Sequence, residues 1–227
     1  MIRIENVETY GWEAAIRGMR NPKNSWSKSD SRLWESTNRL EIGESDLALM
    51  QTLANAGTDH GKFLRMITVT ADITAPLYWW KEYDTYKVGT VANSCSTMHK
   101  IHAKEFTADD FSHEHLLSMA NNDAGDALFL NDANNIRVDG DDLLGLTINV
   151  LNYYRGRYIK TKDKRYWWQM IQLLPSSYNQ RRTVQFNYAV LRNMYHARKA
   201  HKLDCWVTFC NWIENLPYAK ELICNVG

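Results

Sequence analysis

The hydrophobic pattern of the chain alternates in two segments and has helical spacing in most of the rest. Alternation predicts strands over residues 2–7 and 63–73, and the second segment is rich in β-branched residues, which favour strands. Apolar residues that recur three and four positions apart predict amphipathic helices. These helices cover residues 12–19, 46–56, 112–120, 143–157, 164–173, 183–201 and 204–214.

Breaker residues and polar stretches divide these elements without dividing the chain into domains. Pro76 stands where a helix over the aromatic segment 77–86 would begin. Residues 121–142 are polar and rich in Asp and Asn, which makes them the least core-like part of the sequence. No internal repeat or linker is present. We therefore expect one α/β domain over residues 1–227, with more helix than strand.

Composition and charge exclude several classes of protein. Of the 227 residues, 44% are hydrophobic, and 27 basic residues balance 26 acidic ones to a formal net charge of +1. This balance excludes a protein that coats nucleic acid through a large basic excess, so no nucleic-acid partner is expected. No apolar run approaches the roughly 20 residues that span a bilayer. We expect a cytoplasmic protein with reduced thiols and no membrane partner.

Short metal-binding and nucleotide-binding patterns fail on their spacing. From Asp132, the sixth position of a calcium loop would be Arg137 and the twelfth Leu143, where Gly and Glu are needed. We therefore interpret Asp139–Asp142 as a solvated acidic turn. The histidine pairs do not stand in a metal-binding motif, so we interpret them as surface residues. The cysteines lack a Cys-x-x-Cys pair, so we interpret them as buried structural thiols rather than metal ligands. The histidine pairs are His99 with His102 and His113 with His115, and the cysteines are Cys95, Cys205, Cys210 and Cys224.

Two segments together resemble the flavin-dependent thymidylate synthases. The first is APLYWWKEYDTYK at 75–87, followed by NSCS at 93–96, and the second is Leu174-Pro175 followed by Tyr178, Asn187, Asn193 and Arg198. In that family a strand runs into Ala-Pro, an aromatic stretch, Arg-His-Arg and an Asn-Glu-x-Ser-x-Arg run. A Leu-Pro, an Asn and an Arg that ends the same long helix come later.

The resemblance implies a fold and a reaction. It implies a single α/β (α+β) domain with an antiparallel or mixed sheet and a bundle of long helices, assembled as a homotetramer. It implies reductive methylation of deoxyuridine monophosphate (dUMP) at the pyrimidine C5, with FAD, NADPH and methylenetetrahydrofolate. Because the flavin does the difficult chemistry, no protein nucleophile and no catalytic side chain is assigned. Hydroxymethylation of the same carbon stays open.

The resemblance also implies the binding residues. Ser96 matches the signature serine at the nucleotide phosphate, Arg198 the late arginine that holds dUMP, and Glu82 a place where the family often has Gln beside the nucleotide. Four residues match the cofactor side. They are Lys87, Asn93, Asn187 and Asn193.

Helical geometry supports the second segment independently. Asn187 and Arg198 are eleven residues apart, which would return them to nearly one face of a helix, roughly 16 Å apart along its axis. That separation suits the two ends of an extended phosphate-bearing ligand. The alternative is that Asn187 caps neighbouring backbone and Arg198 forms a surface ion pair.

Departures from the family's pattern keep other functions open. Thr85-Tyr86-Lys87 replaces Arg-His-Arg, so only Lys87 keeps a charge there. Four further positions lack the charged residue that the family has there, namely Ser94, Met98, Ile171 and Ala189. The cations that could replace the lost ones are Lys81, Lys87, Arg181 and Arg182. A second hypothesis is therefore a non-catalytic protein that binds or sequesters a nucleotide on the same fold, with the flavin site eroded. A third is a structural protein without a small ligand.

Overall fold

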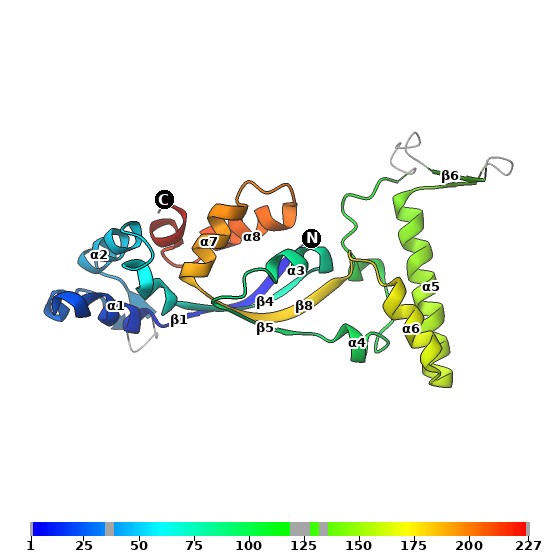
Figure 1. Cartoon of the computed structure of the whole chain (residues 1–227), viewed down its shortest axis with the longest axis horizontal. Helices are drawn as coiled ribbons and strands as arrows, with labels where there is room; N and C mark the ends of the chain where they lie inside the picture. The colour runs from blue at the N-terminus through cyan, green and yellow to red at the C-terminus, as the bar shows by residue number, and fades with distance from the viewer. Residues whose placement is uncertain (1, 35–38, 119–127, 132–135, 226–227) are drawn as a thin grey trace. The chain divides into compact units, whose positions relative to one another are not determined.

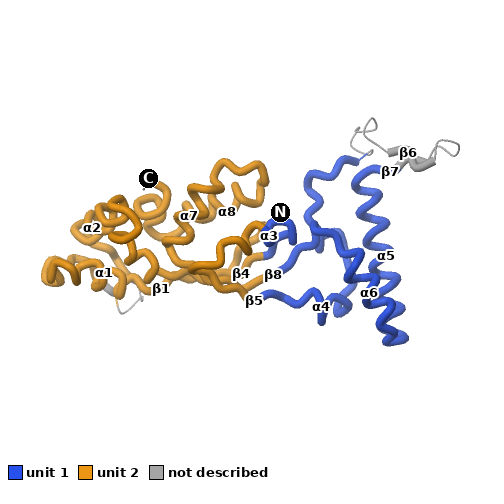
Figure 2. Tube along the Cα trace, viewed as in Figure 1, with its two compact units in different colours: residues 1, 74–81, 94–181 blue, residues 2–73, 82–93, 182–227 orange. Residues whose placement is uncertain are grey.

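The structure of the chain is a computed structural model, which describes residues 2–34, 39–118, 128–131 and 136–225. The chain folds into two compact units (Figure 2). Unit 1 comprises residues 74–81 and 94–181, and unit 2 comprises residues 2–73, 82–93 and 182–227. The interpretation of residues 1–227 as one domain stays a prediction.

Helices and strands are interspersed along the described part of the chain. The strands are β1 (Arg3–Tyr10), β2 (Arg32–Trp34), β3 (Arg39–Glu41), β4 (Thr68–Pro76), β5 (Thr90–Ser94), β6 (Leu128–Asn131), β7 (Ile136–Val138) and β8 (Asn179–Asn187). The α-helices are α1 (Trp12–Arg20), α2 (Glu44–Asn55), α3 (Leu77–Tyr83), α4 (Thr97–Lys100), α5 (Gly140–Thr161), α6 (Lys164–Leu173), α7 (Tyr188–Arg198) and α8 (Asp204–Glu214). Short 3₁₀-helices are η1 (Asn21–Lys23), η2 (Trp26–Lys28), η3 (Gly61–Arg65) and η4 (Ala108–Asp110), and η8 (Lys220–Cys224) is a π-helix.

A four-stranded antiparallel sheet organises the fold. Its strand order is β1-β4-β8-β5, so β4 and β8 are the inner strands and β5 is an edge. The side chains of β4 alternate between buried and half-buried positions, as expected for an inner strand with a covered face. The predicted α/β class is therefore confirmed. Within the residues that the structure describes, no helix is long and apolar enough to cross a membrane.

The core of unit 2 lies between this sheet and the helices α7 and α8 (Figure 1). The ring of Phe186 on β8 is fully buried and lies 5.8 Å from Phe209 and 6.1 Å from Trp212, both on α8. Trp12, at the start of α1, packs edge-on against Tyr188 at the start of α7, with 5.1 Å between ring centroids. These aromatic contacts hold the N-terminal end of α7 against the sheet.

Unit 1 is built around the helix pair α5 and α6. Their buried apolar side chains form one cluster with residues of the preceding segment, and its buried members are Ile101, Phe106, Phe111, Leu144, Leu151 and Met170. Asp139 caps α5: its carboxylate accepts from the backbone N–H of Asp142, and the carboxylate of Asp142 accepts from the backbone N–H of Asp139. The interpretation of Asp139–Asp142 as a solvated turn is therefore wrong, because this motif begins a helix. Asp132 lies outside the described residues.

Four further expectations from the sequence are corrected. Residues 183–187 belong to β8 rather than to a helix, since Thr183, Val184 and Phe186 continue the strand's alternation. Residues 63–65 form part of η3, and the strand begins at Thr68. Residues 112–118 contain no helix, and 119–120 lie outside the described part. Among the four thiols, which are all free, Cys95 is exposed rather than buried.

A buried ion pair connects α1 to α2 in unit 2. Arg20 Nε donates to Asp46 Oδ1 at 2.6 Å, and the two side chains are 4% and 0% exposed. The second carboxylate oxygen accepts from the hydroxyls of Ser29 and Ser31, each at 2.7 Å. Burial alone would raise the pKa of Asp46, but the hydrogen bonds from Ser31, Ser29 and Arg20 outweigh it and lower that pKa below its usual 3.8. The carboxylate of Asp46 thereby joins the end of α1, the start of α2 and the segment 29–31.

Replacing Arg20 with Met should destabilise the protein strongly. The substitution leaves the Asp46 carboxylate buried without its cation, which costs about 3–5 kcal/mol in the free energy of unfolding. The penalty should shrink as the pH falls below the usual aspartate pKa of 3.8, because the contribution of the ion pair is lost as the carboxylate takes up a proton. Urea unfolding between pH 3.5 and 7 measures both effects. Arg17→Met, on the exposed side of the same helix, is the matched control and should change stability by less than about 0.5 kcal/mol.

Candidate functional site

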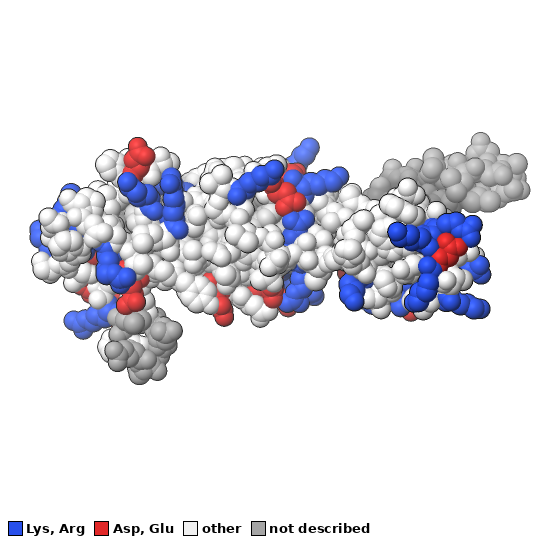
Figure 3. Space-filling view, turned by 60° about the horizontal axis from the view of Figure 1, so that its bottom comes forward, with Lys and Arg blue, Asp and Glu red and all other residues white. Residues whose placement is uncertain are grey.

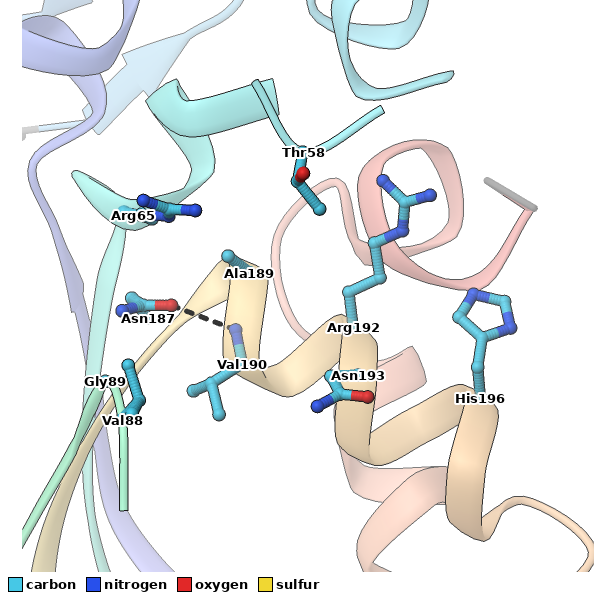
Figure 4. Close-up of a pocket in the computed structure, with 10 residues that line it drawn as sticks. All are labelled: Thr58, Arg65, Val88, Gly89, Asn187, Ala189, Val190, Arg192, Asn193 and His196. Carbon is cyan, nitrogen blue, oxygen red and sulfur yellow. Dashed lines mark hydrogen bonds between the residues drawn. The ribbon is translucent and has the colours of Figure 1, made fainter. Parts of the chain in front are cut away.

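A cleft of about 680 Å³ opens in unit 2 beside the N-terminal half of α7 (Figure 4). This volume is within the range of small-molecule sites, roughly 300–1,000 Å³. Its lining comes from the end of β8, from α7, from η3 and the turn before it, and from the turn that precedes β5, and we call it the α7 cleft. The lining residues are Thr58, Arg65, Val88, Gly89, Asn187, Ala189, Val190, Arg192, Asn193 and His196.

Asn187 stands at the junction where β8 ends and α7 begins. Its Oδ1 accepts a hydrogen bond from the backbone N–H of Val190 at 2.9 Å, so it is the N-cap of α7. Gly89 approaches its amide closely: φ is +84°, and a Cβ at this position would lie 2.6 Å from Asn187 Nδ2. A glycine is required there both by the backbone conformation and by the space.

The interpretation of Asn187 and Arg198 as two residues on one helix face is wrong. Asn187 precedes the helix with extended backbone (φ −119°, ψ 163°). Asn187 instead caps the neighbouring backbone, which is the alternative that the sequence left open. Asn187 and Asn193 nevertheless line the same cleft, where the resemblance placed the cofactor. Their role toward a ligand stays a prediction.

Two arginines and a histidine that the sequence did not point to line the cleft. Arg65, on η3, and Arg192, on α7, both line it, and η3 packs directly against α7. Figure 4 shows the Arg65 guanidinium near the start of α7, whereas the Arg192 guanidinium extends from a later turn of the helix, on the other side of Ala189. His196 is one helical turn beyond Arg192, and its Nε2 donates to the carbonyl oxygen of Ile223 at 2.8 Å. The ten lining residues include no Asp or Glu.

The Arg192 guanidinium is held in place but not neutralised. Its Nη1 donates to the carbonyl oxygen of Ala54 at 2.8 Å, and burial lowers its pKa. Among the described residues, no carboxylate forms an ion pair with Arg192 or with Arg65. A cleft with two such guanidinium groups and no acid favours an anionic ligand. Arg192 follows Ala189 by three residues, which is the signal that could have identified it, because such a pair shares a helix face.

Arg198 takes part in a separate cluster in unit 2. Its Nη1 donates to Glu82 Oε2 at 2.7 Å and its Nε to the hydroxyl of Tyr86 at 2.9 Å. The guanidinium carbon lies 4.8 Å from the ring centroid of Trp206, whose Nε1 also donates to Glu82. The structure therefore brings together Glu82 and Arg198, two of the three residues expected at the nucleotide. It joins them as an ion pair.

The other residues that the resemblance assigns to ligand binding lie in a helix cap, in a turn and on a strand. Ser96, in unit 1, accepts from the backbone N–H of His99 at 2.9 Å and so caps the single-turn helix α4. Lys87 is exposed in the turn before β5, and Asn93 is exposed on β5 itself. Arg182, considered as a replacement cation, pairs with Asp84 at 2.7 Å. The binding roles of Ser96, Lys87 and Asn93 stay predictions.

Comparison with known proteins identifies the fold. No protein-family model matches the chain, and no curated protein matches its sequence. Two solved structures of the flavin-dependent thymidylate synthase ThyX from Helicobacter pylori, both with FAD and dUMP, are similar to it, each with a TM-score of 0.67 and 15% identity. One match covers 99% of each chain; the other covers 100% of this chain and 99% of its own. A UMP/dUMP methylase, PolB from Streptomyces cacaoi bound with 5-Br dUMP, matches with a TM-score of 0.58 and 13% identity over 100% of this chain and 96% of its own.

The chain therefore has a ThyX-like fold. The expected antiparallel sheet and the paired long helices agree with it. At 13–15% identity the similarity shows the fold and leaves the activity to the residues of the site.

Replacing Gly89 with Ala should disturb Asn187 specifically. The new Cβ would collide with the Asn187 amide and break the cap of α7, so the free energy of unfolding should fall by about 2–3 kcal/mol: about 1–2 for the positive φ and about 1 for the cap. Gly57→Ala is the matched control, because Gly57 also has a positive φ, +98°, but open space around it. It should lose only the backbone part. Equal losses in urea unfolding of the two variants would contradict the contact between Gly89 and Asn187.

Proposed function

We propose that this chain binds a flavin nucleotide in the α7 cleft and methylates a uridine monophosphate at the pyrimidine C5. The observation that carries the proposal is a cleft in a ThyX-like fold that holds two guanidinium groups and two amides, with no carboxylate in its lining. The ThyX structures similar to this chain hold FAD and dUMP, and the similar PolB is a UMP/dUMP methylase. Both ligands are anionic and planar at one end.

The cleft fits a flavin nucleotide by its chemistry. Arg65 and Arg192 would hold the phosphates, since a guanidinium presents several N–H donors in one plane to phosphate oxygens. The amides of Asn187 and Asn193 can both donate and accept toward the edge of a flavin ring. When bound and reduced, the flavin supplies the hydride for the transferred carbon, with methylenetetrahydrofolate as carbon donor and NADPH as reductant. The protein binds, orients and excludes water.

These residues would offset the cations missing from Thr85-Tyr86-Lys87 and Ala189. A charge-assisted hydrogen bond contributes roughly 1.5–3 kcal/mol, so two arginines replace a substantial part of the lost binding energy. Arg192 lies on α7, three residues after Ala189, whereas Arg65 comes from η3, outside the segments that carry the family's motif. A homotetramer, which the resemblance implies, belongs to the same proposal.

A second candidate is nucleotide binding without catalysis. It is favoured by the pairing of Arg198 with Glu82, since a dUMP phosphate would have to compete with a carboxylate for the same guanidinium. Under this candidate the cleft binds an anionic nucleotide and no methyl transfer follows.

Titration with flavins tests the main proposal. The purified protein should bind FAD, with quenched flavin fluorescence, and Arg192→Met should weaken binding at least about tenfold through loss of a charge-assisted contact. Riboflavin, which has no phosphate, should be insensitive to this substitution. Arg155→Met, in unit 1, is the control and should leave FAD affinity unchanged. No FAD binding at all would refute the enzyme; FAD binding with no thymidylate from dUMP, folate and NADPH would favour the second candidate.

Glu82→Gln tests whether Arg198 binds the nucleotide phosphate. The amide keeps an oxygen that can accept from Trp206 but removes the negative charge that opposes a phosphate. Affinity for dUMP, measured by calorimetry, should therefore rise at least about threefold. Deoxyuridine, which has no phosphate, serves as the control ligand and should show no gain. Unchanged dUMP affinity would remove Arg198 from the nucleotide site.

A further inference from the structure

A second charged surface lies in unit 1, where α5 ends and α6 begins. We define the α5–α6 corner as residues 153–168. It holds one acidic residue, Asp163, and six basic ones, Arg155, Arg157, Lys160, Lys162, Lys164 and Arg165. Its formal charge is thus +5 in a chain whose total is +1, so the rest of the chain together carries −4. Figure 3 shows Lys and Arg gathered over the part of the molecule that carries these helices.

Helix stability does not explain this charge. Cations are favourable in the last turn of α5 but unfavourable in the first turn of α6, where the helix dipole is positive. That first turn nevertheless carries Lys164 and Arg165 and no acidic residue. Asp163, the N-cap, is bound by Arg165 at 2.7 Å and offsets a single charge. An excess of cations that the fold itself does not need indicates an anionic partner.

Aromatic rings alternate with these cations on the same helix faces. On α5, Tyr153, Arg157 and Lys160 follow one another at the spacing of one face. Arg157 Nη2 donates to the hydroxyl of Tyr166 on α6 at 2.9 Å and lies over its ring at 5.1 Å. On α6, Lys164 and Trp168 are four residues apart. Tyr153 is 61% exposed and Trp168 47% exposed, so both rings are available to a partner.

We propose that the α5–α6 corner binds single-stranded nucleic acid. The cations would follow the phosphate backbone, and the exposed rings of Tyr153 and Trp168 would stack on unpaired bases, which a duplex keeps inside. The near-zero net charge of the whole chain excludes a protein that coats nucleic acid. It does not reveal the local excess of basic residues at the α5–α6 corner. The inference does not depend on the proposed function, because the corner belongs to unit 1 and the α7 cleft to unit 2.

Fluorescence anisotropy with labelled 20-nucleotide oligo(dT) and oligo(U) tests the proposal on the full chain. Binding should weaken about 50-fold between 50 and 200 mM salt, as expected for about four phosphate contacts. The double substitution Lys160→Gln with Lys164→Gln should lower affinity at least about tenfold and flatten the salt dependence. Trp168→Ala should lower affinity about fivefold through lost stacking.

The matched control removes two exposed lysines elsewhere, Lys23→Gln with Lys220→Gln, and should leave affinity unchanged. Circular dichroism melting verifies that each variant is folded. The proposal is overturned by any of three results: no binding at 50 mM salt, equal losses in the control, or tighter binding to a duplex of the same length. Binding to phosphatidylserine vesicles but not to oligonucleotides would assign the corner to a membrane surface and would also overturn it.

Discussion

The direct passage from β8 into α7 is the constraint on which the candidate site depends. The strand ends at Asn187 and the helix begins at Tyr188, with no loop between them. The first N–H groups of the helix therefore need partners other than a preceding turn, and the side chain of Asn187 accepts from one of them, that of Val190. The Tyr188 backbone N–H donates to Ile67 at 3.0 Å and its hydroxyl to Pro217 at 2.6 Å, so the junction is fixed on both sides.

This junction determines what faces the cleft. With Asn187 used as a cap through its oxygen, its Nδ2 is turned toward Gly89, and the next turns of α7 present Arg192, Asn193 and His196 to the same space. A helix N-terminus also carries partial positive charge, which acts in the same direction as the guanidinium groups. The cleft is thus electropositive through both backbone and side chains, although the whole chain is nearly neutral.

Local signals in the sequence are sufficient for several of the helices, but not for the segment 112–118, which is not helical, and not for the junction. The helices predicted over 164–173 and 204–214 agree with α6 and α8 to the residue, because each has an amphipathic face and a clear start and end. The end of β8 has the pattern of a helix because the strand enters α7 without a turn residue, and the apolar spacing runs on across the boundary. Tertiary pairing with β4 and β5 decides its conformation, and no window of local sequence contains that pairing.

The residues of the candidate site also fall into those that the sequence could place and those that it could not. Asn187 and Asn193 could be placed together from the sequence because they lie six residues apart in one motif. Arg65 could not, since its position depends on packing between η3 and α7, which are far apart in the chain. A lost motif arginine can therefore be compensated from another element without leaving a trace at the motif. A site of this fold is better judged by the summed charge of its cleft than by the residues of its motif, because a phosphate responds to the field at its position and not to the segment from which each guanidinium comes.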